Sequence, residues 1–262
     1  MQTARAPDGL VVHYTRTPAT GGGPPLLLLQ GLGAGGAAWA ANVAQLSRTR
    51  TCVVPDQRGT GRTGAPDGPY TTAELAADAA AVLDAEGPAD VVGLSMGGAV
   101  AQELALARPD LVRSLVLCGA FLRSDARARA LTLAWKEAYP LLPPALFARL
   151  SYAWLFSPKF FERPANVDTA VKFALRDRPQ PAGFAGQCDA VLAHDTTSRA
   201  GGLRARTLVL HGTHDALAPV EGARALAAAI PGARLALVEG GYHALNLERQ
   251  AEFARAVLEF AG

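Results

Sequence analysis

The residues most able to do chemistry lie in the stretch Gly93-Leu94-Ser95-Met96-Gly97-Gly98, a Gly-x-Ser-x-Gly pattern with one further glycine. The apolar run over residues 89–93 is typical of a buried strand, and a helical pattern follows over residues 96–108. A chain that turns from strand to helix within two residues makes a tight bend, which lifts Ser95 out of the sheet. Glycines at 93, 97 and 98 leave room for neighbouring backbone. Because glycine-rich sequences produce this short pattern by chance, a nucleophilic serine also requires partners elsewhere in the chain.

A serine hydroxyl attacks at neutral pH only when a histidine accepts its proton and a carboxylate orients that histidine. Three of the five histidines follow expected sheet strands downstream of Ser95. His211 and His214 share one turn with Asp215, so we expect them to shape that turn or lie on the surface. His243 lies in a separate loop after the last strand. Ser95, Asp215 and His243 then lie at one sheet edge, in the order nucleophile, acid, base. The alternative to a catalytic role is that Asp215 only caps the following helix and that His243 is an ordinary loop histidine.

Negative charge on the substrate oxygen requires backbone N–H donors that already point at it. We expect one from Met96, at the start of the helix after the nucleophile. The second is expected from Leu32, because Gly31 and Gly33 on either side let its N–H turn inward. The same glycine-rich loop could bind phosphate. However, it lacks the lysine of a P-loop, and no acid is suitably placed for a dinucleotide.

The elements that position these residues alternate between strands and helices. Two short strands are expected within residues 2–16, followed by strands near 26–29, 51–54, 89–93, 115–118, 207–210 and 235–238. This alternation predicts an α/β fold with a mostly parallel eight-stranded sheet and helices on both faces. The glycine-rich loop with Asp56 and Arg58 is interpreted as structural, with its polar side chains bonded within the loop.

The alternation of strands and helices stops after the sixth strand. Residues 122–200 carry helical patterns interrupted by prolines, and ten aromatic residues lie between 135 and 184. We interpret this segment as a helical lid, with residues 1–121 and 201–262 as the core. Some lid aromatics then line an apolar substrate pocket. Trp135 and Trp154 are chosen from the lid, and Phe121 and Leu217 are added because they lie next to loops at the active sheet edge.

Length and composition narrow the function classes. The chain has 262 residues, half of them hydrophobic, which suits one large core. A net charge of +2 and the absence of a basic run with interleaved aromatics argue against nucleic-acid binding. The three cysteines show no disulfide or zinc spacing. No signal peptide or membrane span is visible, so we expect a cytoplasmic protein without metal or cofactor, acting on a small molecule. The oligomeric state stays open.

The chain resembles the α/β-hydrolase superfamily over nearly its whole length. The elbow motif, the His211–Asp215 turn with Pro219, and Gly241-Tyr242-His243 match its motifs. Residues 187–199 resemble the lid exit of the branch that contains 3-oxoadipate enol-lactonases, esterases and cofactor-free haloperoxidases. Many members have His-Gly where this chain has Gln30-Gly31, which leaves the shape and polarity of the acyl pocket around Gln30 in doubt.

This resemblance implies a serine hydrolase, of carboxylesterase or lactonase type, that cleaves small, largely apolar substrates through an acyl-enzyme. The fold also hosts other chemistry. The alternatives are a C–C bond hydrolase or non-hydrolytic cyclase of secondary metabolism, and a non-catalytic small-molecule receptor.

Overall fold

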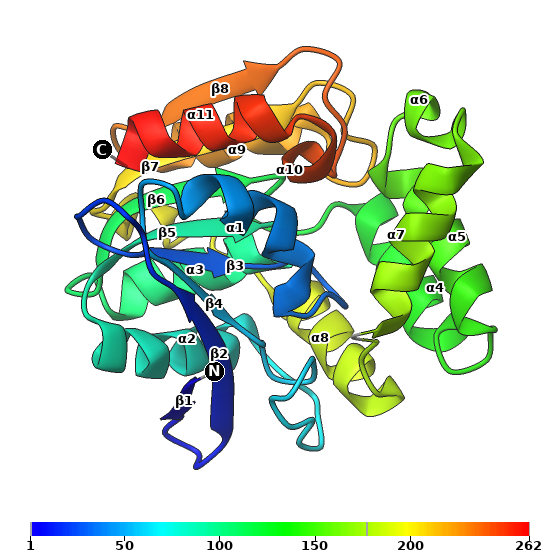
Figure 1. Ribbon diagram of the computed structural model, residues 1–262, viewed down its shortest axis with the longest axis horizontal. Coiled ribbons are helices and arrows are strands. Elements are labelled where there is room, and N and C mark those ends of the chain that lie inside the picture. Colours follow the sequence, from blue (N-terminus) through cyan, green and yellow to red (C-terminus); the bar gives the residue numbers. More distant parts are fainter. Residues whose placement is uncertain (1, 177, 262) are drawn as a thin grey trace.

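Continuous apolar runs form the centre of one eight-stranded sheet in the computed structural model, which describes residues 2–176 and 178–261 (Figure 1). The spatial order is β1-β2-β4-β3-β5-β6-β7-β8; β2 pairs antiparallel with both β1 and β4, and all other pairs are parallel. The strands are β1 Gln2–Arg5, β2 Val11–Thr17, β3 Leu26–Leu29, β4 Cys52–Pro55, β5 Ala89–Leu94, β6 Val112–Cys118, β7 Arg206–Gly212 and β8 Arg234–Val238. The expected fold class is thus confirmed. The expected core limits at 1 and 262, and lid position 177, lie outside the described residues.

Both faces of the sheet are buried, which explains why its central strands are apolar without alternation. Leu27 and Leu29 of β3 belong to one core cluster, and Leu26 and Leu28 to another on the opposite face. The first face is covered by α2 Thr72–Glu86, α3 Met96–Ala107 and α9 Val220–Ala229. The second is covered by α1 Ala40–Leu46, α10 Leu245–Glu248 and α11 Gln250–Ala261 (Figure 1). A capping box between Thr71 and Glu74 starts α2.

Short turns precede two helices of the core. The 3-10 turn η1 Gly36–Trp39 leads into α1. The four-residue α10 precedes α11, and Arg249 between them is not helical. The short α10 meets the insertion, since the Glu248 carboxylate accepts hydrogen bonds from the N–H and hydroxyl of Ser157. This contact holds the end of the α10 turn against the insertion.

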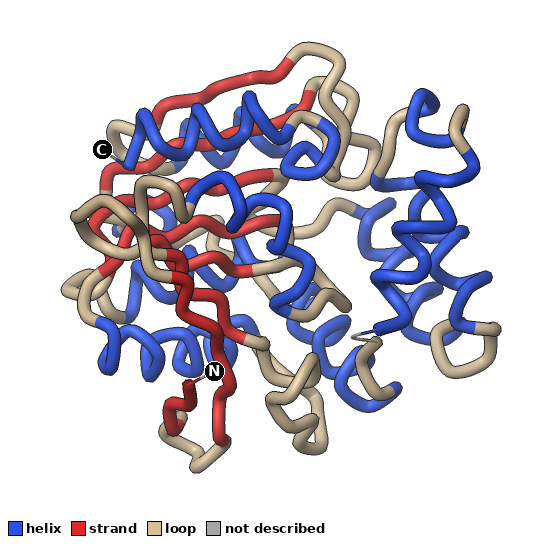
Figure 2. The backbone as a smooth tube through the Cα atoms, viewed as in Figure 1, coloured by secondary structure: helices blue, strands red, loops and turns tan. Residues whose placement is uncertain are grey.

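The insertion lies between β6 and β7, as expected, and is helical (Figure 2). Its helices are α4 Ala126–Ala138, α5 Pro144–Leu155, α6 Pro158–Phe161, α7 Pro164–Arg176 and α8 Pro181–Ala193. α5 and α7 share a small apolar cluster of their own, Ala148 with Val167 and Val171. By contrast, Ala190 and Val191 of α8 belong to the main core cluster. The first four helices group together at the right of Figure 1, and α8 lies between them and the core.

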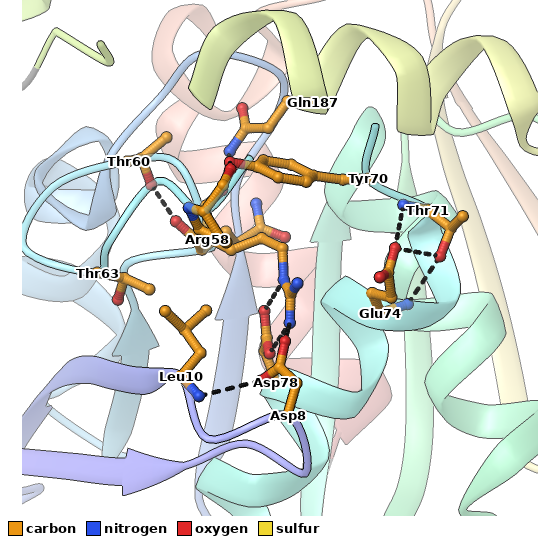
Figure 3. Close-up of polar contacts among 12 residues, drawn as sticks. Asp8, Leu10, Arg58, Thr60, Thr63, Tyr70, Thr71, Glu74, Asp78 and Gln187 are labelled. Atoms are coloured by element: carbon orange, nitrogen blue, oxygen red, sulfur yellow. Dashed lines mark hydrogen bonds and ion pairs between the residues drawn. The ribbon is translucent and has the colours of Figure 1, made fainter. Parts of the chain in front are cut away.

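Arg58 connects the loop after β4 to the body of the molecule (Figure 3). Its guanidinium donates two hydrogen bonds of 2.7 Å to buried Asp78 on α2 and one of 2.9 Å to Asp8. The loop was expected to bond within itself, which holds for Asp56: its carboxylate accepts the N–H of Arg62 as well as that of Gly36. Arg58 instead reaches out of the loop, because α2 presents a buried carboxylate beneath it.

Candidate active site

Ser95 is the tip of a strained turn between β5 and α3. Its φ of 54° and ψ of −118° make it the one non-glycine residue with positive φ in the described ranges. Side chains rarely adopt this conformation, and it persists only where the surrounding packing imposes it. That packing is tight: a Cβ on Gly93 or Gly97 would fall onto neighbouring backbone, and one on Gly98 would lie 2.5 Å from the Ala120 Cβ. The three glycines are therefore required by close approach, as the sequence predicts.

Gly97→Ala is expected to destabilise the protein by about 3 kcal/mol or more. The added methyl group would overlap the Leu29 carbonyl oxygen, and neither backbone segment has room to move. Urea unfolding measures this loss. Gly222→Ala on α9 is the matched control, because its Cβ would meet nothing within 4 Å, and it should stabilise by about 0.5–1 kcal/mol. Equal stability of the two variants would contradict the packing argument.

Asp215 and His243, the acid and base expected from the sequence, are in direct contact. His243 Nδ1 lies 2.7 Å from Asp215 Oδ2, and both side chains are buried. The other carboxylate oxygen accepts the N–H groups of Leu217 and Ala218 at 2.9 and 2.8 Å. Because a carboxylate only accepts, the proton of the pair sits on Nδ1, which leaves Nε2 as a proton acceptor. The loops after β7 and β8 therefore build one rigid unit.

The charge of Asp215 is held by its surroundings. Burial by itself would raise the pKa of this carboxyl, but His243, His211 and the Ala218 N–H outweigh burial and lower the pKa. His211 Nε2 lies 2.7 Å from the Ala218 carbonyl oxygen and 3.5 Å from Asp215 Oδ2. Burial lowers the pKa of His211, which keeps it neutral. His211 therefore shapes the turn as expected, from a fully buried position, whereas His214 is exposed.

The loop after β3 lies against Ser95. A Cβ built on Gly31 would stand 3.4 Å from the Ser95 Cβ. Next along this loop, the N–H of Gly33 donates to Gln187 Oε1 at 2.9 Å and that of Ala34 to the Gly31 carbonyl at 3.3 Å. On the other side of Ser95, Met96 opens α3, where the first N–H groups have no intrahelical acceptor.

Two cavities meet at Ser95. The larger measures about 1380 Å³ and the smaller about 210 Å³. Both are lined by Leu32, Ser95, Trp135, Leu217 and His243. The larger cavity extends between the core and the insertion, where rings from α5, α6, α7 and α8 line it. The serine and the histidine therefore face a common space that is open to a small molecule.

The expected pocket residues are brought to these cavities with one exception. Trp135 and Leu217 line both cavities, Gln30 lines the larger one, and Phe121 lines the smaller one. Trp154 lines neither; its ring lies beneath the guanidinium of Arg127 instead. The cavity-lining residues of α5 recur at residues 144, 147, 148, 151, 152 and 155. Residue 154 lies at the edge of that face, one heptad after residue 147, and its ring packs on Arg127 of α4.

Residues that the sequence did not single out also border the site. Gly119, which follows β6 with φ of 56°, lies under the pair: a Cβ there would stand 3.2 Å from His243 Cε1. Gln187 of α8 holds the loop after β3 through Gly33. A glycine directly after a strand at the active edge is a usable signal for the first. Residue 187 begins the segment that resembles a lid exit, but nothing local marks the contacts of Gln187, because its partners are 129 and 154 residues away along the chain.

His194, buried behind Phe121, makes the fold sensitive to acid. Burial lowers the pKa of His194 to about 4, and its Nδ1 lies 3.0 Å from the Thr72 hydroxyl. An unfolded histidine titrates near 6.5, so the unfolded chain binds the extra proton first as the pH falls. Stability should therefore decline from about pH 6.5 toward pH 4, by up to about 3 kcal/mol from this residue. Urea unfolding at several pH values should show a shallower decline for His194→Gln; an unchanged slope would contradict this assignment.

The described residues contain no cluster of histidine, cysteine and carboxylate side chains able to hold a metal ion. Within the same ranges, no helix has the length and apolar character needed to cross a membrane.

Comparison with known proteins agrees with this geometry. A family model described as the alpha/beta hydrolase fold matches residues 24–250. A protein assigned as the carbamate hydrolase RutD of Azorhizobium caulinodans is 32% identical over 92% of both chains. The pyrrolizixenacetamide deacetylase of Xenorhabdus hominickii is 31% identical over 92% of this chain and 91% of its own. The crystal structure of the enol-lactonase of Burkholderia xenovorans LB400 superimposes with a TM-score of 0.89, at 29% identity over 99% of both chains. The chain therefore belongs to the α/β-hydrolase family, in the branch that contains the enol-lactonases.

Proposed function

We propose that this hydrolase cleaves a carboxylic ester or lactone through an acyl-enzyme on Ser95. The observation that carries the proposal is the buried His243–Asp215 pair, which shares a cavity with a strained serine. His243 Nε2 takes the Ser95 proton as the hydroxyl oxygen attacks the carbonyl carbon. The same proton then goes to the departing alkoxide. Water, deprotonated by His243, releases the acid and restores Ser95.

The tetrahedral intermediate is stabilised by the N–H groups of Leu32 and Met96. Two facts support this choice. Gly33 and Ala34, the neighbours of Leu32 in its loop, already donate their N–H groups elsewhere. Met96 occupies the first turn of α3, where the positive end of the helix dipole adds to the N–H.

The substrate is a small, largely apolar molecule. The shared walls of the two cavities are apolar apart from the serine and histidine, since Leu32, Trp135 and Leu217 form the rest. The carbamate hydrolase, the deacetylase and the enol-lactonase are named for reactions at a carbonyl carbon that carries a leaving group. An acyl-enzyme on Ser95 suits all three, and an ester or lactone requires only an oxygen leaving group.

Hydrolysis of short p-nitrophenyl esters, together with labelling by a fluorophosphonate, tests the proposal. We expect turnover of the acetate or butyrate ester and addition of one phosphonate group per chain. Mass spectrometry should place that group on the peptide that contains Ser95. An unlabelled wild type, or a label on another residue, would falsify the mechanism.

A further inference from the structure

Gln187 is a fully buried amide that joins two loops of the core from the insertion. Its Oε1 accepts the N–H of Gly33 at 2.9 Å, and its Nε2 donates to the Arg58 carbonyl oxygen at 2.9 Å. Both ends of the amide are thus satisfied, which fixes its orientation and rotamer. The first contact is one residue from Leu32, the donor proposed for the oxyanion.

The anchor at the other end of Gln187 is rigid. Arg58, whose carbonyl accepts from Gln187, is held by the buried carboxylate of Asp78 and by Asp8 (Figure 3). Because the Gln187 side chain is bonded to this firmly held loop, it also restrains Gly33 at its other end.

Helix α8, which carries Gln187, packs directly on the core. A Cβ on Gly183 would lie 2.7 Å from the Gly59 Cα, and one on Gly186 would lie 2.5 Å from the Tyr70 ring. A Cβ on Gly33 would in turn stand 2.8 Å from the ring of Phe184. Such close contacts leave α8 no room to shift relative to these loops. It acts as a fixed wall, unlike α5 and α7, which pack on each other and line the large cavity.

We propose that Gln187 is a positioning residue for the oxyanion hole: it holds the Gly33 N–H away from the substrate and keeps that of Leu32 directed at the oxyanion. The assignment rests on the serine-hydrolase function proposed above. Loss of this contact leaves the Gly33 N–H without its acceptor, and the loop then rotates or fluctuates. The free energy of the transition state rises and that of the bound substrate does not, because the oxyanion hole acts only where charge develops.

Gln187→Leu tests this with a shape of similar size and no hydrogen bonds. We expect kcat for p-nitrophenyl butyrate to fall about 10- to 100-fold, less than the 10²–10³ for outright loss of a donor, with KM within twofold. A trifluoromethyl ketone, whose adduct on Ser95 carries the oxyanion, should bind more weakly by the same factor as kcat/KM falls. Hydrogen exchange of the peptide spanning residues 31–35 should also become faster.

Cys188→Ala is the matched control. Cys188 is buried on the same helix, in an aromatic cluster that also packs on Leu32, so the variant loses packing beside the loop and leaves both Gln187 contacts in place. It therefore separates the effect of packing from that of the two hydrogen bonds. It should lower the melting temperature without changing kcat or inhibitor affinity. The assignment is overturned if folded Gln187→Leu keeps kcat within threefold of wild type, or if Cys188→Ala loses kcat equally. A wild type that neither turns over ester nor takes up the fluorophosphonate overturns the proposed function itself, and this assignment with it.

Discussion

Ser95→Ala is expected to lower kcat for p-nitrophenyl esters by about 10⁴-fold or more and to abolish fluorophosphonate labelling. The hydroxyl oxygen is the only atom removed, so binding of the ester should persist. The residue stays in the same conformation, because the glycines around it impose the positive φ. If the variant keeps activity within tenfold of the wild type, Ser95 is excluded as the nucleophile.

Ser95→Gly separates the chemistry from the strain. Glycine adopts φ of 54° without steric cost, so this variant should be as stable as Ser95→Ala or more stable. Both variants should be equally inactive. Ser95→Gly then loses activity without losing stability. This pattern is expected of a strained nucleophile and not of a structural serine.

Asp215→Asn is expected to lower kcat by about 10³- to 10⁴-fold. The carboxylate now accepts from His243 Nδ1, Leu217 N–H and Ala218 N–H. An asparagine that keeps the two backbone bonds through its oxygen turns its NH₂ group toward His243. Nδ1 must then accept, the proton moves to Nε2, and the histidine no longer deprotonates Ser95. The pH dependence of kcat should change shape as well as height.

Asp90→Asn is the matched control for that variant. Asp90 is also buried and bonded, to Arg50 and the Ser114 hydroxyl, but it stands at the first residues of β5, at the opposite edge of the sheet from Ser95. Its loss should cost stability with kcat unchanged in the folded fraction. A small effect of Asp215→Asn, equal to that of the control, would reduce Asp215 to a structural role.

The two parts of the insertion have different expected roles. Aromatic rings of α5, α6 and α7 line the large cavity, and these helices share a small apolar cluster of their own. Helix α8 instead supplies Ala190 and Val191 to the main core and Gln187 to the loop beside Ser95. We therefore expect substitutions of the cavity-lining residues on α5 or α7 to change which substrates bind, and substitution of Gln187 on α8 to change the rate for all of them.

Much of the fold and of the candidate site followed from local signals. Apolar runs and glycine-rich bends each act over a few residues, and they predicted the eight strands. Helical patterns interrupted by prolines predicted the place of the insertion. Ser95, Asp215 and His243 each lie in a loop that follows a strand. That position sufficed to place them at one sheet edge, because parallel strands bring their carboxyl ends together.

Only the tertiary structure decided what depends on side-chain direction and on distant partners. Trp154 was assigned to the pocket by its type, yet its ring packs on Arg127 of the neighbouring helix α4 and lines neither cavity. Gln187 carried no local signal, since its importance comes from Gly33 and Arg58, which the chain brings to it from more than a hundred residues away. Sequence spacing determines which residues share an element and an edge. The packing of helices against loops decides which atoms meet, because that depends on the summed shape of many side chains.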